Sequence, residues 1–337
     1  MVKTKIFPKK LLTYTKNNYF CLKIQRNFMK RSVLSLLGLF VSLAVCAQSF
    51  TINGIRYKVV SSNTVKTDLS YDTGIDNYDI PPTVEYDGQT YAVSCIGSYL
   101  TSRTAKSVSI PQTIQVIETK AFARTESLSE VRIADIASWV SIDFVGEDNN
   151  PLSNKNYTNL SVYIDGKETR DIAIPDGVEE IKANSFYKCY WLSSITLPST
   201  LKKIGGNAFY RCWGLTSLEL PENITEIGEG AFYECNGLNS IIVKSVVPAL
   251  FNGSYQFDDA TYKRAILYVP KGTTDLYRMT PGWSNFANIE EIDPTGIQSV
   301  EIERNNNGDM YSIDGVKIEC PESGMIIIQN GKKRIAK

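Results

Sequence analysis

Three cysteines recur at a fixed spacing and are the first candidates for chemistry. Cys189, Cys212 and Cys235 are each 23 residues apart, whereas Cys95 and Cys320 do not share the spacing. A zinc site needs ligands that converge on one point, which residues on three successive repeats would not do, and the chain has no histidine. Adjacent repeats would bring two thiols within disulfide range, but parallel Cβ vectors fit disulfide geometry poorly. We therefore expect small buried hydrophobes and no metal site.

The other groups that catalysis requires are also missing. The absence of histidine removes the commonest general base and the Ser-His and Cys-His pairs. No Gly-x-Ser-x-Gly, phosphate-binding glycine loop or calcium loop is present. Carboxylate pairs such as Glu179-Glu180 and Asp258-Asp259 are scattered, and a glycosidase needs two carboxyls on facing walls of a cleft. We expect a stack of coils to offer no obvious cleft, so we predict no catalytic residues and no cofactor.

The charges of the chain balance only when its first 47 residues are counted. Residues 1–47 hold nine of the 36 basic side chains and none of the 36 acidic ones. The remaining chain carries 27 basic against 36 acidic side chains. Nucleic-acid binding needs clustered Lys and Arg, so we expect no nucleic-acid partner.

The three cysteines belong to a repeat that occurs three times between Ile174 and Val243. Each copy starts with Ile-Pro or Leu-Pro, passes through two apolar positions to Ala-Phe or Ser-Phe, and continues with Cys and Leu. An earlier copy starts at Ile110 and has Thr125 in place of the cysteine. A fixed period of this length is the sequence signature of a solenoid, in which each coil stacks on its neighbours. We predict a solenoid of mostly β structure with short helices and turns.

Stacking in register would bring equivalent residues of successive coils about 4.8 Å apart. Phe186, Phe209 and Phe232 should then form one buried column, while the residue after each points outward. We predict a binding surface from five outward aromatic residues on the turns: Tyr187, Tyr190, Tyr210, Trp213 and Tyr233. Exposed aromatic clusters often mark binding sites. Alternatively, the tyrosines only stack on one another and cover the edge of the core.

The outward strand positions form a second possible binding face. They are mostly small and polar: Ser107, Ser109, Glu130, Arg132, Ser194, Thr196, Ser217, Glu219, Ser240 and Ile242. Such a flat sheet would suit a protein or glycan partner. It would equally suit a solvated surface without a ligand.

Residues 1–47 have the pattern of a secretory signal peptide. Met29 and two basic residues precede a mostly apolar run, and small residues favour cleavage after Ala47. The apolar run is too short to span a bilayer, and no other segment is long and apolar enough. We expect Met29 to be the true start. A lipid anchor at Cys46 is a disfavoured alternative, because valine precedes it where a small residue is usual.

The rest of the chain is expected to contain an end cap, the solenoid and a tail. The expected boundaries are 48–95 for an N-terminal β cap, 96–295 for the solenoid with an insertion at 134–173 and a C-terminal cap at 244–295, and 296–337 for a small β tail. Asn-Gly and Asp-Gly pairs between apolar runs predict tight hairpin turns in the caps and the tail, for example at Asn53-Gly54.

The repeat resembles the leucine-rich repeats of the BspA-like class of bacterial surface proteins. The resemblance covers roughly residues 80 to 290 and rests on the Ile/Leu-Pro start, the Ala-Phe pair, and the Cys and Leu that follow. It implies an exported protein, at the cell surface or outer membrane or outside the cell, that binds proteins or host-matrix components without catalysis. The segment Met310–Lys337 is similar to short β tails on many exported proteins of anaerobic Gram-negative bacteria, in some of which the tail is associated with secretion.

Two functions therefore remain open. The first is a non-catalytic adhesion module that presents the repeats to a host protein, a matrix component or a glycan. The alternative is a structural or envelope-associated scaffold without a dedicated ligand.

Overall fold

The computed structural model describes residues 48–68, 74–146, 149–153 and 160–292, and the backbone of four strands between 310 and 335. The signal peptide, Met29 and Cys46 of the sequence analysis lie outside the described residues. None of the helices in the described ranges is both long enough and apolar enough to cross a membrane.

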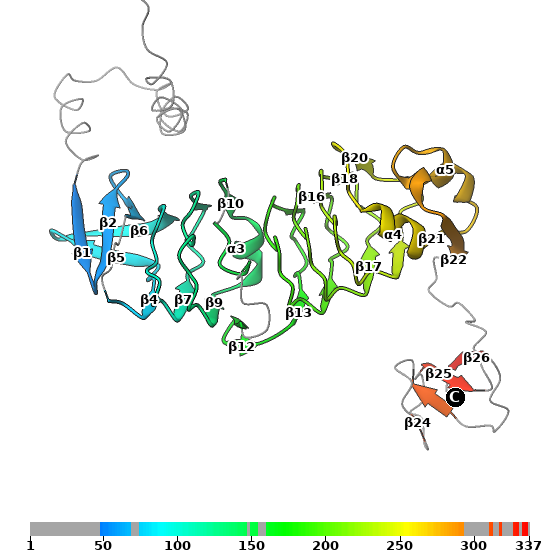
Figure 1. Ribbon diagram of the computed structural model, residues 1–337, viewed down its shortest axis with the longest axis horizontal. Helices are drawn as coiled ribbons and strands as arrows, with labels where there is room; N and C mark the ends of the chain where they lie inside the picture. The colour runs from blue at the N-terminus through cyan, green and yellow to red at the C-terminus, as the bar shows by residue number, and fades with distance from the viewer. Residues whose placement is uncertain are drawn as a thin grey trace, which may run out of the picture. The chain divides into compact units, whose positions relative to one another are not determined.

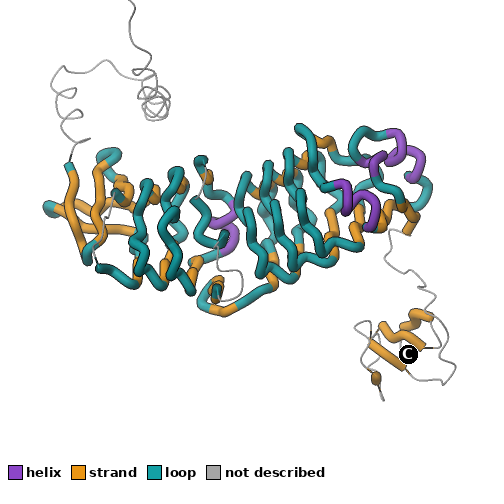
Figure 2. Tube along the Cα trace, viewed as in Figure 1, coloured by secondary structure: helices purple, strands orange, loops and turns teal. Residues whose placement is uncertain are grey.

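The repeats form the coils of a solenoid, and most coils have a longer strand on one wall and a two-residue strand on another (Figures 1 and 2). The longer strands form the first wall: β4 (Asn77–Asp79), β7 (Ser107–Ile110), β9 (Glu130–Ile133), β11 (Ser161–Ile164), β13 (Asp171–Ala173), β15 (Ser194–Thr196), β17 (Ser217–Leu220), β19 (Ser240–Val243), β21 (Ile266–Pro270) and β22 (Asn288–Ile292). The short strands form the second wall: β8 (Val116–Ile117), β10 (Asp143–Phe144), β14 (Glu180–Ile181), β16 (Lys203–Ile204), β18 (Glu226–Ile227) and β20 (Leu250–Phe251).

Neighbouring coils pair in parallel, and the pairing follows the sequence period. Ile181 lies opposite Ile204, which lies opposite Ile227. Along a strand, alternate side chains face the core. In β15, Ile195 is buried, whereas the two flanking residues are exposed. The period therefore predicts both the stacking and the buried positions.

The core contains the expected aromatic column. Phe186, Phe209 and Phe232 are completely buried, and the ring centroids of successive members lie 5.2 and 5.3 Å apart. Phe257 adds one more stacked ring at 5.3 Å from Phe232. The sequence period had faded there, because Phe257 follows Phe232 by 25 residues instead of 23.

The N-terminal strands are β1 (Ser49–Ile52), β2 (Ile55–Val59), β3 (Thr64–Thr67), β5 (Thr83–Tyr86) and β6 (Gln89–Ile96). The turn between β1 and β2 uses Asn53 and Gly54, both with positive φ, as a type I′ hairpin requires. β3 and β6 run parallel, and β6 pairs in parallel with β8. The N-terminal sheet thus continues directly into the second wall and covers the first coil.

The sequence repeat loses register over residues 134–173, and the described residues of this range form an irregular coil. Asp135 caps the short helix α3 (Ile136–Val140) by accepting a hydrogen bond from Ser138 N. β11 pairs in parallel with β9 and then turns through Asp165 and Gly166 into β12 (Lys167–Glu168). The sheets that contain β10 and β12 end here, and new sheets begin at β13 and β14. The irregular coil therefore interrupts the hydrogen-bonded ladder on both walls.

Short helices close the C-terminal end of the coils: α4 (Asp259–Arg264), α5 (Thr274–Met279) and the 3-10 helix η2 (Trp283–Asn285). Trp283 is fully buried, and its Nε1 donates to the carbonyl of Ala249 at 2.8 Å. Tyr277 in α5 donates its hydroxyl to Ser245 O at 2.7 Å. These bonds fasten the helices to the last coil.

Near the C-terminus, the four described strands form one antiparallel sheet in the order β24 (Lys317–Ile318), β23 (Met310–Ser312), β25 (Ile326–Gln329), β26 (Lys332–Ile335).

Candidate functional site

The repeated thiols lie inside the coils and bond to backbone. Cys212 donates its Sγ proton to Phe186 O at 3.2 Å, and Cys235 donates to Phe209 O at 3.0 Å. Burial raises the pKa of Cys235 to about 12 and raises the pKa of Cys189 well above its usual value. Since the thiolate is the reactive and metal-binding form, these cysteines are poor nucleophiles. Within the described ranges, no group of three or more His, Cys, Asp or Glu residues could hold a metal ion.

The five predicted aromatic residues lie together on the turns of three successive coils, and we call them the aromatic surface: Tyr187, Tyr190, Tyr210, Trp213 and Tyr233. Tyr187 and Tyr210 stack with centroids 5.1 Å apart, and Tyr210 and Tyr233 stack at 5.9 Å. All three tyrosines are half-buried. The column therefore covers the edge of the core and also offers ring edges to solvent.

The backbone after each tyrosine holds this column in place. Lys188, Arg211 and Glu234 all adopt left-handed conformations, with φ of 58°, 59° and 56°. Non-glycine residues adopt this conformation at a cost and need support from their surroundings. Two such supports are backbone bonds to the next coil, from Lys188 N to Tyr210 O at 2.7 Å and from Arg211 N to Tyr233 O at 2.9 Å.

Arg211 lies at the centre of the aromatic surface. Its guanidinium forms a two-point ion pair with Glu234, at 2.8 and 3.0 Å. The same group lies 5.2 Å from the Tyr210 ring centroid, a cation–π distance. The hydrogen bond to Glu234 is the main cause that raises the pKa of Arg211. Sequence reasoning missed Arg211 and Glu234, although each directly follows a tyrosine of the column.

Trp213 and Tyr190 form the more exposed part of the surface. Their rings meet edge to face with centroids 4.4 Å apart, and Trp213 is 42% exposed. The neighbouring Trp191 is instead buried, and its Nε1 has no hydrogen-bond partner among the described residues. The next coil has Gly214 at the position equivalent to Trp191, and a Cβ on Gly214 would lie 2.4 Å from Leu192 O.

Tyr255 extends the tyrosine column by one more coil. It is 69% exposed and meets Tyr233 edge to face at 6.0 Å. Sequence reasoning missed it, because it follows Tyr233 by 22 residues and the preceding residue is not a phenylalanine.

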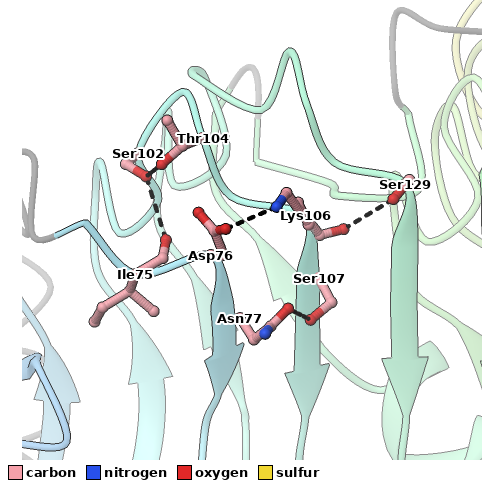
Figure 3. A network of polar contacts seen from close by, with 8 residues as sticks. All are labelled: Ile75, Asp76, Asn77, Ser102, Thr104, Lys106, Ser107 and Ser129. Carbon is pink, nitrogen blue, oxygen red and sulfur yellow. Dashed lines mark hydrogen bonds and ion pairs between the residues drawn. The ribbon is translucent and has the colours of Figure 1, made fainter.

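The outward strand positions are largely bonded to one another across coils (Figure 3). Ser107 donates to Asn77 at 2.8 Å, and Lys106 pairs with Asp76 at 2.8 Å. Further along the wall, Arg132 pairs with Glu130 at 2.7 Å and lies 4.5 Å from the ring centroid of Tyr163. These polar groups thus have partners on their own protein.

A groove of about 360 Å³ lies beside the irregular coil, between β10 and the second-wall strands that follow it. The sequence-based expectation that a stack of coils has no cleft was therefore wrong. In a regular stack the second wall would be one continuous sheet. Here β10, with Asp143 and Phe144, belongs to one sheet, and another sheet starts at Glu180.

Comparison with known proteins identifies the repeat. The model of the BspA type leucine rich repeat region matches six copies, over residues 64–144 and 161–273. A leucine rich cell surface protein from Faecalibacterium prausnitzii is similar at 20% identity over 66% of this chain and 76% of its own, with a TM-score of 0.33. A leucine rich repeat protein from T. pallidum is similar at 19% identity over 66% and 81% of the two chains, with a TM-score of 0.34. A search of curated proteins found no match.

Proposed function

Since the chain belongs to the BspA-type leucine-rich repeat family, we propose that it is a non-catalytic interaction module that binds a protein partner through the aromatic surface. The observation that carries the proposal is the exposure of Trp213, 42%, beside Tyr190 and the ion-paired Arg211. Trp, Tyr and Arg are the residues most enriched at the energetic centres of protein interfaces.

The rigidity of the surface supports the same proposal. The rings of Tyr187, Tyr210 and Tyr233 are stacked on one another, and their turns are hydrogen-bonded to adjacent coils. Ordering flexible side chains reduces binding affinity. A pre-ordered aromatic surface avoids most of this cost.

We further infer that the protein is exported and acts at the cell surface as an adhesion module for host proteins or matrix components. The signal-like pattern of residues 1–47 supports this location.

The test is a binding screen of the purified protein against host proteins and matrix components, followed by variants. Trp213→Ala should weaken binding at least about tenfold, or 1.4 kcal/mol, with little change in the thermal midpoint because the side chain is 42% exposed and lies outside the core. Tyr163→Ala, on the first wall, is the matched control and should bind normally. Equal binding by Trp213→Ala and the native protein would refute the role of the aromatic surface.

The alternative function is an envelope scaffold without a dedicated ligand. The half-buried, mutually stacked tyrosines are compatible with it, because they cover the core whether or not a ligand binds. Protease treatment of intact cells separates the two functions. Cleavage of the protein on intact cells supports the adhesion module, whereas protection together with the absence of any binding partner supports the scaffold.

A further inference from the structure

The groove beside the irregular coil exists because two parts of the second wall do not pair. β10 belongs to the N-terminal sheet, whereas β14 begins a new sheet. The junction is bridged by a backbone bond from Lys182 N to Val140 O at 2.9 Å and by an ion pair of Lys182 with Asp143 at 3.3 Å. The groove starts at this junction and continues over the next three coils, as far as Asn252.

The floor of the groove is backbone. A Cβ on Gly205 would lie 2.4 Å from Ala183 N, and a Cβ on Gly228 would lie 2.5 Å from Gly206 N. Side chains are therefore excluded where these coils touch. Gly205, Gly206, Gly228 and Phe144 are the lining residues without a polar side chain, apart from Ala183.

One side of the groove carries a continuous chain of alternating charges. In order, its members are Asp143, Lys182, Glu180, Lys203, Glu226 and the amide of Asn252. Successive charged groups are 3.3, 3.9, 3.8 and 2.9 Å apart, and Asn252 hydrogen-bonds to Glu226. The hydrogen bond from Lys203 lowers the pKa of Glu226, which favours its charged form. Every amine in the groove thus already has carboxylate neighbours.

We propose that this groove binds a neutral carbohydrate of about disaccharide size. An anionic ligand would have to compete with carboxylates for both lysines, and a cationic ligand would have to compete with lysines for the carboxylates. A hydroxyl group can donate to a carboxylate and accept from a lysine at the same time, so a sugar can bind without breaking an ion pair. The volume lies at the lower end of the range for small-molecule sites.

The proposal is independent of the aromatic surface, because the two sites share no residue. The probes are four neutral disaccharides, cellobiose, lactose, maltose and chitobiose, observed by saturation-transfer NMR with the full-length purified protein. At least one should bind saturably, with a Kd on the order of 1 mM. Lys203→Met should weaken that binding at least about tenfold.

Lys202→Met is the matched control. Lys202 is the adjacent lysine and pairs with Glu179 at 2.8 Å, but it does not line the groove. Binding should be unchanged in this variant. An equal loss in Lys202→Met and Lys203→Met would overturn the proposal, as would the absence of saturable binding by all four sugars.

A second variant covers the case in which Lys203→Met unfolds. Ala183→Trp places a large ring at the exposed rim of the groove and leaves each charged side chain intact. It should abolish sugar binding while the thermal midpoint stays within a few degrees. Full retention of binding by Ala183→Trp would overturn the proposal. The proposal would also be overturned if inorganic phosphate bound in the groove and displaced the sugar.

Discussion

The indole Nε1 of Trp139 donates a hydrogen bond to the backbone carbonyl of Ser185, at 3.0 Å. In the regular coils, the equivalent carbonyl accepts from a backbone N–H of the preceding coil, as when Phe186 N bonds to Ala208 O at 2.8 Å. The side chain of Trp139 therefore replaces the backbone donor that the irregular coil lacks. Asn150 Nδ2 reaches the same carbonyl at 3.0 Å. The irregular coil is thus bonded to the repeats through side chains.

We expect the two donors to substitute for one another. Trp139→Phe keeps the aromatic contact with Phe144 (centroids 5.1 Å apart) and should lower the free energy of unfolding by about 1 kcal/mol. Asn150→Ala should cost a similar amount. The double variant should lose about 3 kcal/mol, more than the sum, because only then does the buried Ser185 carbonyl lack a donor. Urea unfolding measures all three, and strictly additive losses would contradict the shared role.

The regular coils could be predicted from the sequence, and the irregular coil could not. The 23-residue period alone places Phe209 between Phe186 and Phe232, because identical coils repeat identical neighbours. Trp139 lies in the segment where the repeat loses register, so nothing local in the sequence indicates that it contacts Ser185, 46 residues further along the chain. The same reason hides the groove, which results from a mismatch between unlike coils.

The aromatic surface was only partly predictable. The period places Tyr187, Tyr210 and Tyr233 in one column, and the structure has them stacked. It also places Trp213 beside Tyr190, but it does not indicate that the neighbouring Trp191 is buried, because the next coil has Gly214 at that position. Whether these residues bind a partner stays a prediction.

Removing one ring from the buried column should be severe. Phe209 has no exposed surface and stacks on Phe186 and Phe232 at 5.2 and 5.3 Å. Phe209→Ala should lower the free energy of unfolding by about 3 to 5 kcal/mol, because the flanking coils cannot collapse into the cavity. The adjacent Tyr210→Ala is the control and should cost much less, since that ring is half-buried. If chemical denaturation showed similar losses of unfolding free energy for Phe209→Ala and Tyr210→Ala, the buried column would not support the fold.

A methyl group between two coils should be equally disruptive. Gly228→Ala would place its Cβ 2.5 Å from Gly206 N, a backbone atom that can move only with its whole coil. We expect a loss of about 3 kcal/mol from overpacking. Gly272→Ala is the control. Its φ of 81° is unfavourable for alanine, but nothing lies within 4 Å of the new Cβ. Its loss should be about 1 kcal/mol, and thermal unfolding of both variants would show the difference.

The buried thiols should make stability fall at alkaline pH. An unfolded cysteine has a pKa of about 8.5, whereas burial raises the pKa of Cys235 to about 12 in the folded protein. Above pH 8.5 the unfolded state therefore binds fewer protons than the folded state, so stability decreases as pH rises toward 12. This thiol alone should contribute a decrease of about 1.4 kcal/mol per pH unit in that window. Below pH 8 its contribution should be constant.

The Cys235→Ser variant isolates this contribution, because serine does not titrate and can still donate to Phe209 O. Urea unfolding of both proteins at pH 8, 9, 10 and 11 under reducing conditions gives two stability curves. Lysine and tyrosine titration affects both curves, so only their difference reports on the thiol. The native protein should lose its advantage over the variant by about 1.4 kcal/mol per pH unit above pH 9. Parallel curves would show that Cys235 ionises as readily in the folded chain as in the unfolded chain, which burial in the coil should prevent.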